Sequence, residues 1–138
     1  MQEIRRWPSD RLGLIAATYT PFHADGSLNL DAVEGQAAAL ATQRLRGVFV
    51  CGSTGEGSSM TSPERMALTQ RWREVAGEDM ELIVHVGHSS VEDARLLAAH
   101  ADQLGVDGIA AVAPSYFRPR NVDELVAVNA AIAAAAPN

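Results

Sequence analysis

The chain has 138 residues, and 47% of them are hydrophobic, which is enough for one folded domain with a buried core. The net charge is −6 and the 11 positive charges are scattered arginines, which argues against a nucleic-acid partner. The sequence has no run of about 18 uncharged apolar residues to span a membrane, and residues 1–12 lack the apolar core of a secretion signal. The single cysteine, Cys51, forms no disulfide within the chain and suits a reducing cytoplasm, where we expect the protein to act.

Four short apolar runs have the character of β-strands. Most of them lack the alternation of polar and apolar residues, which is typical of strands buried on both faces of a parallel sheet. They span 13–19 (GLIAATY), 47–51 (GVFVC), 82–86 (LIVHV) and 108–112 (GIAAV).

The stretches between these runs carry helix start and stop signals. A polar side chain that can cap a helix precedes each stretch, and glycine or proline follows three of them. The expected helices are 31–44 capped by Asn29 or Ser27, a helix capped by Thr61 that continues to Ala76, 91–104 capped by Ser90, and 122–136 capped by Asn121.

Strand and helix patterns alternate, and the strands start roughly 26 to 35 residues apart, which is the spacing of βα units. The sequence therefore predicts an α/β protein of four βα units with a parallel sheet. Such a sheet is either open, as in a flavodoxin, or half of a (β/α)₈ barrel, and the periodicity does not choose between them.

The loop after the second run, Gly52-Ser53-Thr54-Gly55-Glu56-Gly57, is the richest in candidate site residues. Its glycines allow a tight turn, and the Ser53 and Thr54 hydroxyls stand beside backbone amides that can hold a carboxylate or phosphate. The alternative is a polar turn that only leads into the next helix. The loop is neither a P-loop nor a dinucleotide-binding turn, since it lacks the spacing of both motifs.

Four further residues have a functional and a structural interpretation. Glu56 is a base or, as we favour, an anchor for its loop. Tyr116 either passes a proton or packs at the mouth of the sheet or at a subunit contact. His85 lies within a strand and is expected to be a core or hydrogen-bonded residue, and His88 is a loop residue that either touches ligand or, as we favour, stays on the surface. The histidines lack metal-binding spacing, so we expect no metal.

Segments in all four βα units resemble the N-acetylneuraminate lyase and dihydrodipicolinate synthase family. The resemblance covers about residues 12–138. Within it, the sequence of the matching segments is closer to the animal-type lyases than to the synthases. The segments that carry it are GLIAATYTPF at 13–22, GSTGEG at 52–57, IVHVG at 83–87, GVDGIA at 105–110 and APSYFRP at 113–119.

This resemblance implies a (β/α)₈ barrel of which residues 1–138 form a single partial domain, the amino-terminal half. It also implies a homo-oligomer, no cofactor, and a lyase that joins a lysine to a 2-keto acid, commonly pyruvate, as a Schiff base. In a sialic-acid-type aldolase this reaction cleaves a sugar acid to pyruvate and an aldehyde. The resemblance assigns the keto-acid carboxylate to Ser53 and Thr54, between Gly52 and Gly55. It assigns a proton relay to Ser53 and Tyr116, with the tyrosine reaching a neighbouring subunit's site.

The 138 residues contain no lysine. In the family the Schiff-base lysine ends the sixth strand, beyond the four strands expected here. An imine needs a primary amine, and arginine does not deprotonate, so we expect this chain alone to be inactive. The alternatives are a synthase-like member of the family, or a non-catalytic half-barrel that binds a keto acid and assembles with itself to cover its exposed strand edges.

Overall fold

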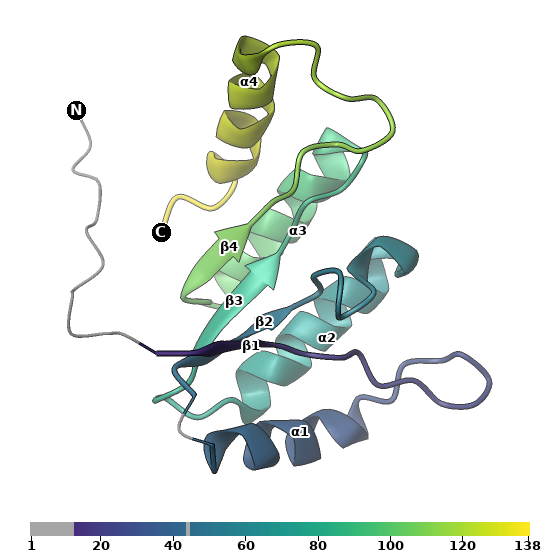
Figure 1. Ribbon diagram of the computed structural model, residues 1–138, viewed down its shortest axis with the longest axis vertical. Coiled ribbons are helices and arrows are strands. Elements are labelled where there is room, and N and C mark those ends of the chain that lie inside the picture. Colours follow the sequence, from purple (N-terminus) through teal and green to yellow (C-terminus); the bar gives the residue numbers. More distant parts are fainter. Residues whose placement is uncertain (1–12, 44) are drawn as a thin grey trace.

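A computed structural model describes residues 13–43 and 45–138, and within these residues four strands alternate with four α-helices (Figure 1). The predicted end of the first helix at Arg44 and the segment 1–12 lie outside the described residues. A short 3-10 helix, η1, precedes α2. The elements are β1 (Ile15–Ala17), α1 (Asp31–Ala41), β2 (Gly47–Val50), η1 (Gly57–Ser59), α2 (Ser62–Val75), β3 (Glu81–His85), α3 (Val91–Gln103), β4 (Gly108–Ala110) and α4 (Val122–Ala133).

The four strands are parallel and lie in the order β1-β2-β3-β4, the order in which they occur in the chain. An open flavodoxin-like sheet would reverse direction at its first strand, so this order excludes it. Since crossovers between parallel strands are right-handed, a sheet that advances in one direction carries all its helices on one face. Consecutive helices do pack against each other, from α1 to α4. The architecture is that of the amino-terminal half of a (β/α)₈ barrel.

The core lies between the sheet and these helices. Val48 and Val50 of β2 and Leu82 of β3 are buried beneath them, and Trp72 of α2 is fully buried. On the opposite face, Phe49 of β2 is only half-buried. The expectation of strands buried on both faces is therefore wrong for the described residues, because helices cover only one face of this sheet.

Three of the predicted helix caps are confirmed. Thr61 accepts a hydrogen bond from the Glu64 amide while the Glu64 carboxylate accepts one from the Thr61 amide at 2.8 Å, which together form a capping box. Ser90 and Asn121 likewise cap α3 and α4. Asn29 accepts from the Ala32 amide at 3.3 Å, but it lies one residue before Leu30, the N-cap position of α1.

Gly105 ends α3 as predicted, in a left-handed conformation with a φ of 64°. The Gly105 amide donates to the Asp102 carbonyl and the Val106 amide to the Ala101 carbonyl, the pairing of a Schellman motif. The first and last helices are shorter than predicted and end at Ala41 and Ala133. No helix in the described residues is long and apolar enough to cross a membrane.

Candidate functional site

The loop between β2 and η1 is a tight, backbone-held turn. Its first residue, Cys51, has a φ of 58° and Glu56 has a φ of 54°, so both non-glycine residues adopt the left-handed conformation. The Gly57 amide donates to the Gly52 carbonyl at 3.1 Å, which closes the turn. From the loop after β1, the buried Thr20 hydroxyl donates to the Gly55 carbonyl at 2.5 Å. The turn is thus fixed to its neighbour along the edge of the sheet.

This fixed turn leaves two adjacent backbone amides without partners. Within residues 13–43 and 45–138, the amides of Ser53 and Thr54 donate no hydrogen bond, and both side chains are exposed. A rigid turn with free N–H groups and hydroxyls has the donors that a carboxylate needs.

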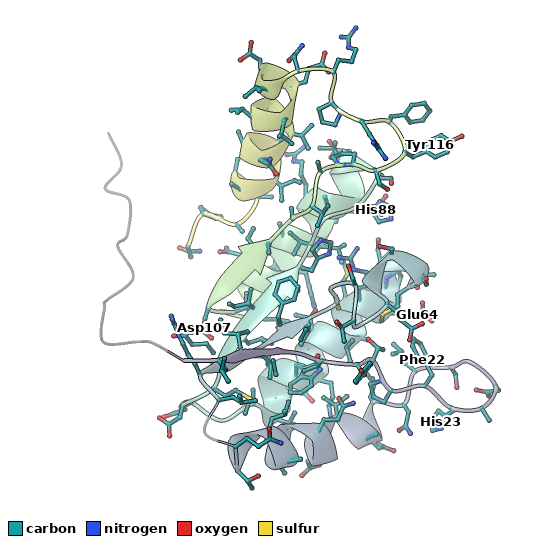
Figure 2. All side chains as sticks on the ribbon, in the orientation of Figure 1. Phe22, His23, Glu64, His88, Asp107 and Tyr116 are labelled. Carbon is teal, nitrogen blue, oxygen red and sulfur yellow. The ribbon has the colours of Figure 1, made fainter. Side chains whose placement is uncertain are left out.

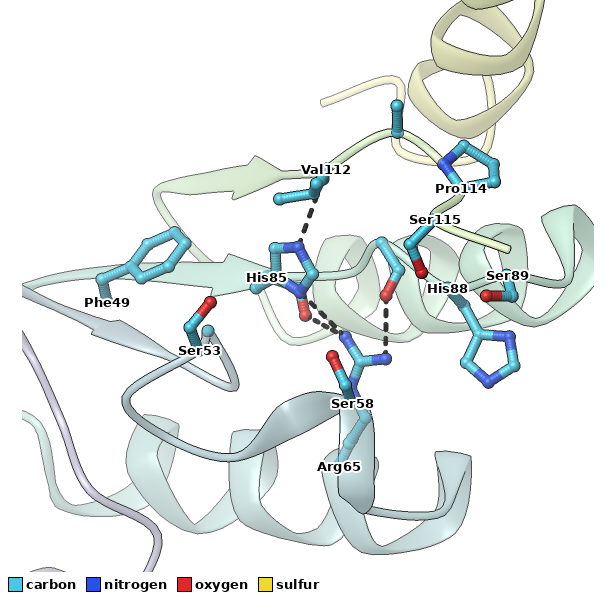
Figure 3. A pocket seen from close by; sticks show the side chains of 13 residues that line it. Phe49, Ser53, Ser58, Arg65, His85, His88, Ser89, Val112, Pro114 and Ser115 are labelled. Carbon is cyan, nitrogen blue, oxygen red and sulfur yellow. Dashed lines mark hydrogen bonds between the residues drawn. The ribbon is translucent and has the colours of Figure 1, made fainter. Parts of the chain in front are cut away.

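A pocket of about 350 Å³ lies at the carboxyl ends of β2, β3 and β4 (Figure 3). Serine and histidine side chains and one arginine line it, and among the described residues no aspartate or glutamate does. Its electrostatic character therefore suits an anion. The lining residues are Phe49, Gly52, Ser53, Ser58, Arg65, His85, Gly87, His88, Ser89, Val112, Ala113, Pro114 and Ser115.

Arg65, from the first turn of α2, is the cation of this pocket. It is 1% exposed, and its guanidinium donates to the Gly87 carbonyl at 3.0 Å and to the His85 carbonyl. Its Nε has no hydrogen-bond partner, and none of its contacts in the described chain is a carboxylate. Burial lowers the pKa of Arg65, but a guanidinium stays protonated in proteins. Within residues 13–43 and 45–138 no carboxylate pairs with this positive charge.

His85 ends β3, and its ring faces the pocket. The Val112 amide donates to His85 Nε2 at 3.2 Å. Burial, and then the charge of Arg65, lower the pKa of His85, so the imidazole is neutral near pH 7. The prediction of a hydrogen-bonded histidine is confirmed.

Cys51, the residue after β2, is 1% exposed and belongs to the core. Burial raises the pKa of its thiol, so the thiol is not an activated nucleophile.

The structure brings together some of the residues singled out in the sequence and separates others. Ser53 and Gly52 line the pocket, while Thr54 and Gly55 do not. Tyr116 is 81% exposed and packs edge-on against Phe117, with ring centroids 4.9 Å apart. Figure 2 shows Tyr116 pointing outward from the loop after β4, away from the sheet.

The favoured interpretation of Glu56 is wrong. Glu56 does not anchor its loop through its side chain, which makes no hydrogen bond within the described residues. Its side chain is exposed, and the backbone of the loop supplies the anchoring instead. His88 is partly exposed and lines the pocket, and its Nδ1 accepts from the Ser90 amide at 2.9 Å.

Sequence reasoning missed Arg65. Its position was nevertheless unusual, because a cation in the first turn of a helix opposes the helix dipole and implies a compensating contact elsewhere. The carbonyls of the β3 end supply that contact.

Comparisons with known proteins agree with this fold. The sequence pattern of the dihydrodipicolinate synthetase family matches residues 10–138. N-acetylneuraminate lyase A of Xenopus laevis is 43% identical over 128 residues, covering 91% of this chain and 42% of that protein.

Two solved structures are also similar. The N-acetylneuraminate lyase of Proteus mirabilis has a TM-score of 0.89 and 38% identity, with 91% of this chain and 43% of that chain covered. A catalytic lysine mutant of the sialic acid aldolase of Ruminococcus gnavus has a TM-score of 0.87 and 33% identity, with 91% and 41% covered. The 138 residues thus span less than half the length of these proteins.

Proposed function

Because the chain belongs to the dihydrodipicolinate synthetase family, we propose that its loops after β2, β3 and β4 form the keto-acid half of a Schiff-base aldolase site. The activity proposed is that of an N-acetylneuraminate lyase, which cleaves a sugar acid to pyruvate and an aldehyde. The 43% identity with lyases of that name supports this branch of the family. In this proposal residues 1–138 are one partial domain.

The main support for the proposal is the pocket that Ser53 and Arg65 line, in which none of the described lining residues is an aspartate or glutamate. The Ser53 hydroxyl and the free amides of Ser53 and Thr54 supply hydrogen-bond donors to the keto-acid carboxylate. The positive charge of Arg65, which pairs with no carboxylate among the described residues, attracts the keto-acid carboxylate inside the partly desolvated pocket. Thr54 contributes its amide, since its side chain does not line the pocket.

The nucleophile is assigned to a lysine outside these residues, since none of the 138 is a lysine. A class I aldolase needs a primary amine that can lose its proton, and the 11 arginines do not. The similar Ruminococcus gnavus enzyme is described as having a catalytic lysine, which supports this assignment.

Tyr116 is assigned to a proton relay in a second copy of the chain. Its ring is 81% exposed and does not line the pocket that contains Ser53, so it does not act on that pocket from its place in the same chain. An outward-pointing tyrosine on a loop at the active-site end of the sheet suits a site completed between subunits, and the proposal includes a homo-oligomer.

A second candidate function is a non-catalytic keto-acid binder, and the lysine-free sequence favours it. Borohydride reduction in the presence of labelled pyruvate separates the two. The 138-residue chain remains unmodified under both proposals, whereas the protein with its lysine-bearing partner segment is labelled only if it is an aldolase. Labelling of the 138-residue chain at any group other than the α-amine would contradict both.

Pyruvate binding tests the pocket itself. In a titration of the ¹⁵N-labelled chain followed by NMR, pyruvate should shift the amides of Ser53 and Thr54. Ser53→Ala should weaken binding about tenfold, the effect of removing one hydrogen bond to a charged group. The control is Ser59→Ala, because Ser59 is exposed in the same segment and does not line the pocket. Equal binding by both variants would refute the assignment of Ser53.

A further inference from the structure

Two side chains connect α2 with the ends of β3 and β4 at the floor of the pocket. Arg65 reaches from α2 to the carbonyls of His85 and Gly87, at the end of β3. The His85 ring then accepts the Val112 amide, just beyond β4. Figure 3 shows the hydrogen bonds of Arg65 and of the Val112 amide meeting at His85.

These contacts fix which nitrogen of His85 carries the proton. A backbone amide only donates, so Nε2, which faces the Val112 amide, has no hydrogen. A neutral imidazole then carries its proton on Nδ1. Nδ1 also lies 3.4 Å from Nη2 of Arg65, but two donors form no hydrogen bond, so this contact is a repulsive one for a charged ring.

The ring has little freedom to move. A Cβ at Gly87 would lie 3.0 Å from His85 Nε2 and 2.9 Å from the Val112 nitrogen, so glycine is needed for this approach. On another side Phe49 packs edge-on against the ring, with centroids 6.2 Å apart. The ring is therefore held where its Nε2 meets the Val112 amide.

We propose that Arg65 and His85 are positioning residues of the pocket: Arg65 fixes the end of β3, and the His85 ring holds Val112, the first residue of segment 112–115, against the end of β3. The claim about pyruvate rests on the proposed function, whereas the claim about the strand ends does not. Arg65 from α2 is the charged group that faces the ring. Phe49 and Val112, which also contact the ring, carry no charge.

The state of His85 in the unmodified chain is the first test. NMR of the ¹⁵N-labelled imidazole should show the proton on Nδ1 at pH 7 and a titration midpoint below 6.5, the ordinary value of histidine. The Val112 amide signal should move with the same midpoint, since protonation of Nε2 removes its acceptor. The proposal would be overturned if the ring carried its proton on Nε2 at pH 7, or if the Val112 amide signal did not change as His85 titrates.

Substitution of His85 is the second test. In His85→Leu the Val112 amide loses its partner, and pyruvate binding should weaken about tenfold. In His85→Gln a side-chain oxygen can replace Nε2 as acceptor, so binding should stay within about threefold and lose its dependence on pH between 5 and 7. The control is His23→Leu, because His23 is an exposed loop residue outside the pocket and its loss should leave binding unchanged.

The two tests separate this inference from the proposed function. If the unmodified chain binds no pyruvate, the proposed function fails, while the His85 proton and the Val112 signal still decide the positioning role. If His85→Leu does not fold, His85→Gln and the NMR titration of the unmodified chain decide it. A folded His85→Leu variant that binds pyruvate as tightly as the unmodified chain would refute the positioning role.

Discussion

Gly57→Ala should destabilise the chain by about 3 kcal/mol, although it adds only one methyl group. A Cβ at Gly57 would lie 1.9 Å from the Cys51 carbonyl oxygen and 2.7 Å from its carbon, against 3.4 Å for an ordinary contact. The contact is with backbone, so no side-chain rotation relieves it. Either the turn opens, with loss of the hydrogen bond from Gly57 to Gly52, or the left-handed Cys51 moves out of the core.

Gly35→Ala is the matched control for this prediction. Gly35 lies within α1, where a Cβ added to it would have nothing within 4 Å, so alanine should stabilise the helix by about 0.5 to 1 kcal/mol. Urea unfolding followed by circular dichroism measures both free energies, and the midpoints should shift in opposite directions. A Gly57→Ala chain that unfolds at the urea concentration of the unmodified chain would refute the steric reasoning.

Three further predictions concern a helix cap, the dependence on pH and the buried thiol. Thr61→Ala should lower the free energy of unfolding by about 1 kcal/mol in urea, through loss of the capping box. Hydrogen bonds from the Thr61 amide and hydroxyl lower the pKa of Glu64, so their contribution to stability is complete above the ordinary value of 4.5 and disappears as the pH falls through the lower folded value. Melting temperatures between pH 6 and 2 should show this loss, and it should be smaller in Thr61→Ala. The Cys51 thiol, whose pKa burial raises, should react with a thiol reagent only as fast as the chain unfolds, and rapid labelling in native buffer would contradict this.

The positions of the elements could be predicted from the sequence because their signals are local. Thr61, Ser90 and Asn121 cap the helices they precede, and Gly105 supplies the left-handed residue after α3. Each signal depends on a few neighbouring residues and on backbone geometry that does not change with the rest of the fold. The ends of α1 and α4 were less predictable, since alanine-rich sequence favours a longer helix than packing retains.

The candidate site was predictable only in part. The Gly-Ser-Thr-Gly turn was evident from its glycines and its place after an apolar run, and Ser53 does line the pocket. Arg65 lies 12 residues after Ser53 and lines the same pocket. The only local signal in the sequence was its place at the start of a helix. The exposure of Tyr116 and the free side chain of Glu56 depend on loop conformations that no pattern of residue types fixes.

The sequence by itself determined four βα units, their capped helices, the glycine-rich turn and the absence of lysine among these 138 residues. The tertiary structure decided the strand order, and with it that helices cover one face of the sheet while the other faces the inside of a barrel. It also decided which polar groups meet. Arg65 lies on α2, His85 on β3 and Val112 in the loop after β4, and only the parallel alignment of strand ends brings a guanidinium, an imidazole and an amide to one place. Hydrogen bonds and charges act over a few ångströms in space, and sequence separation does not measure that distance.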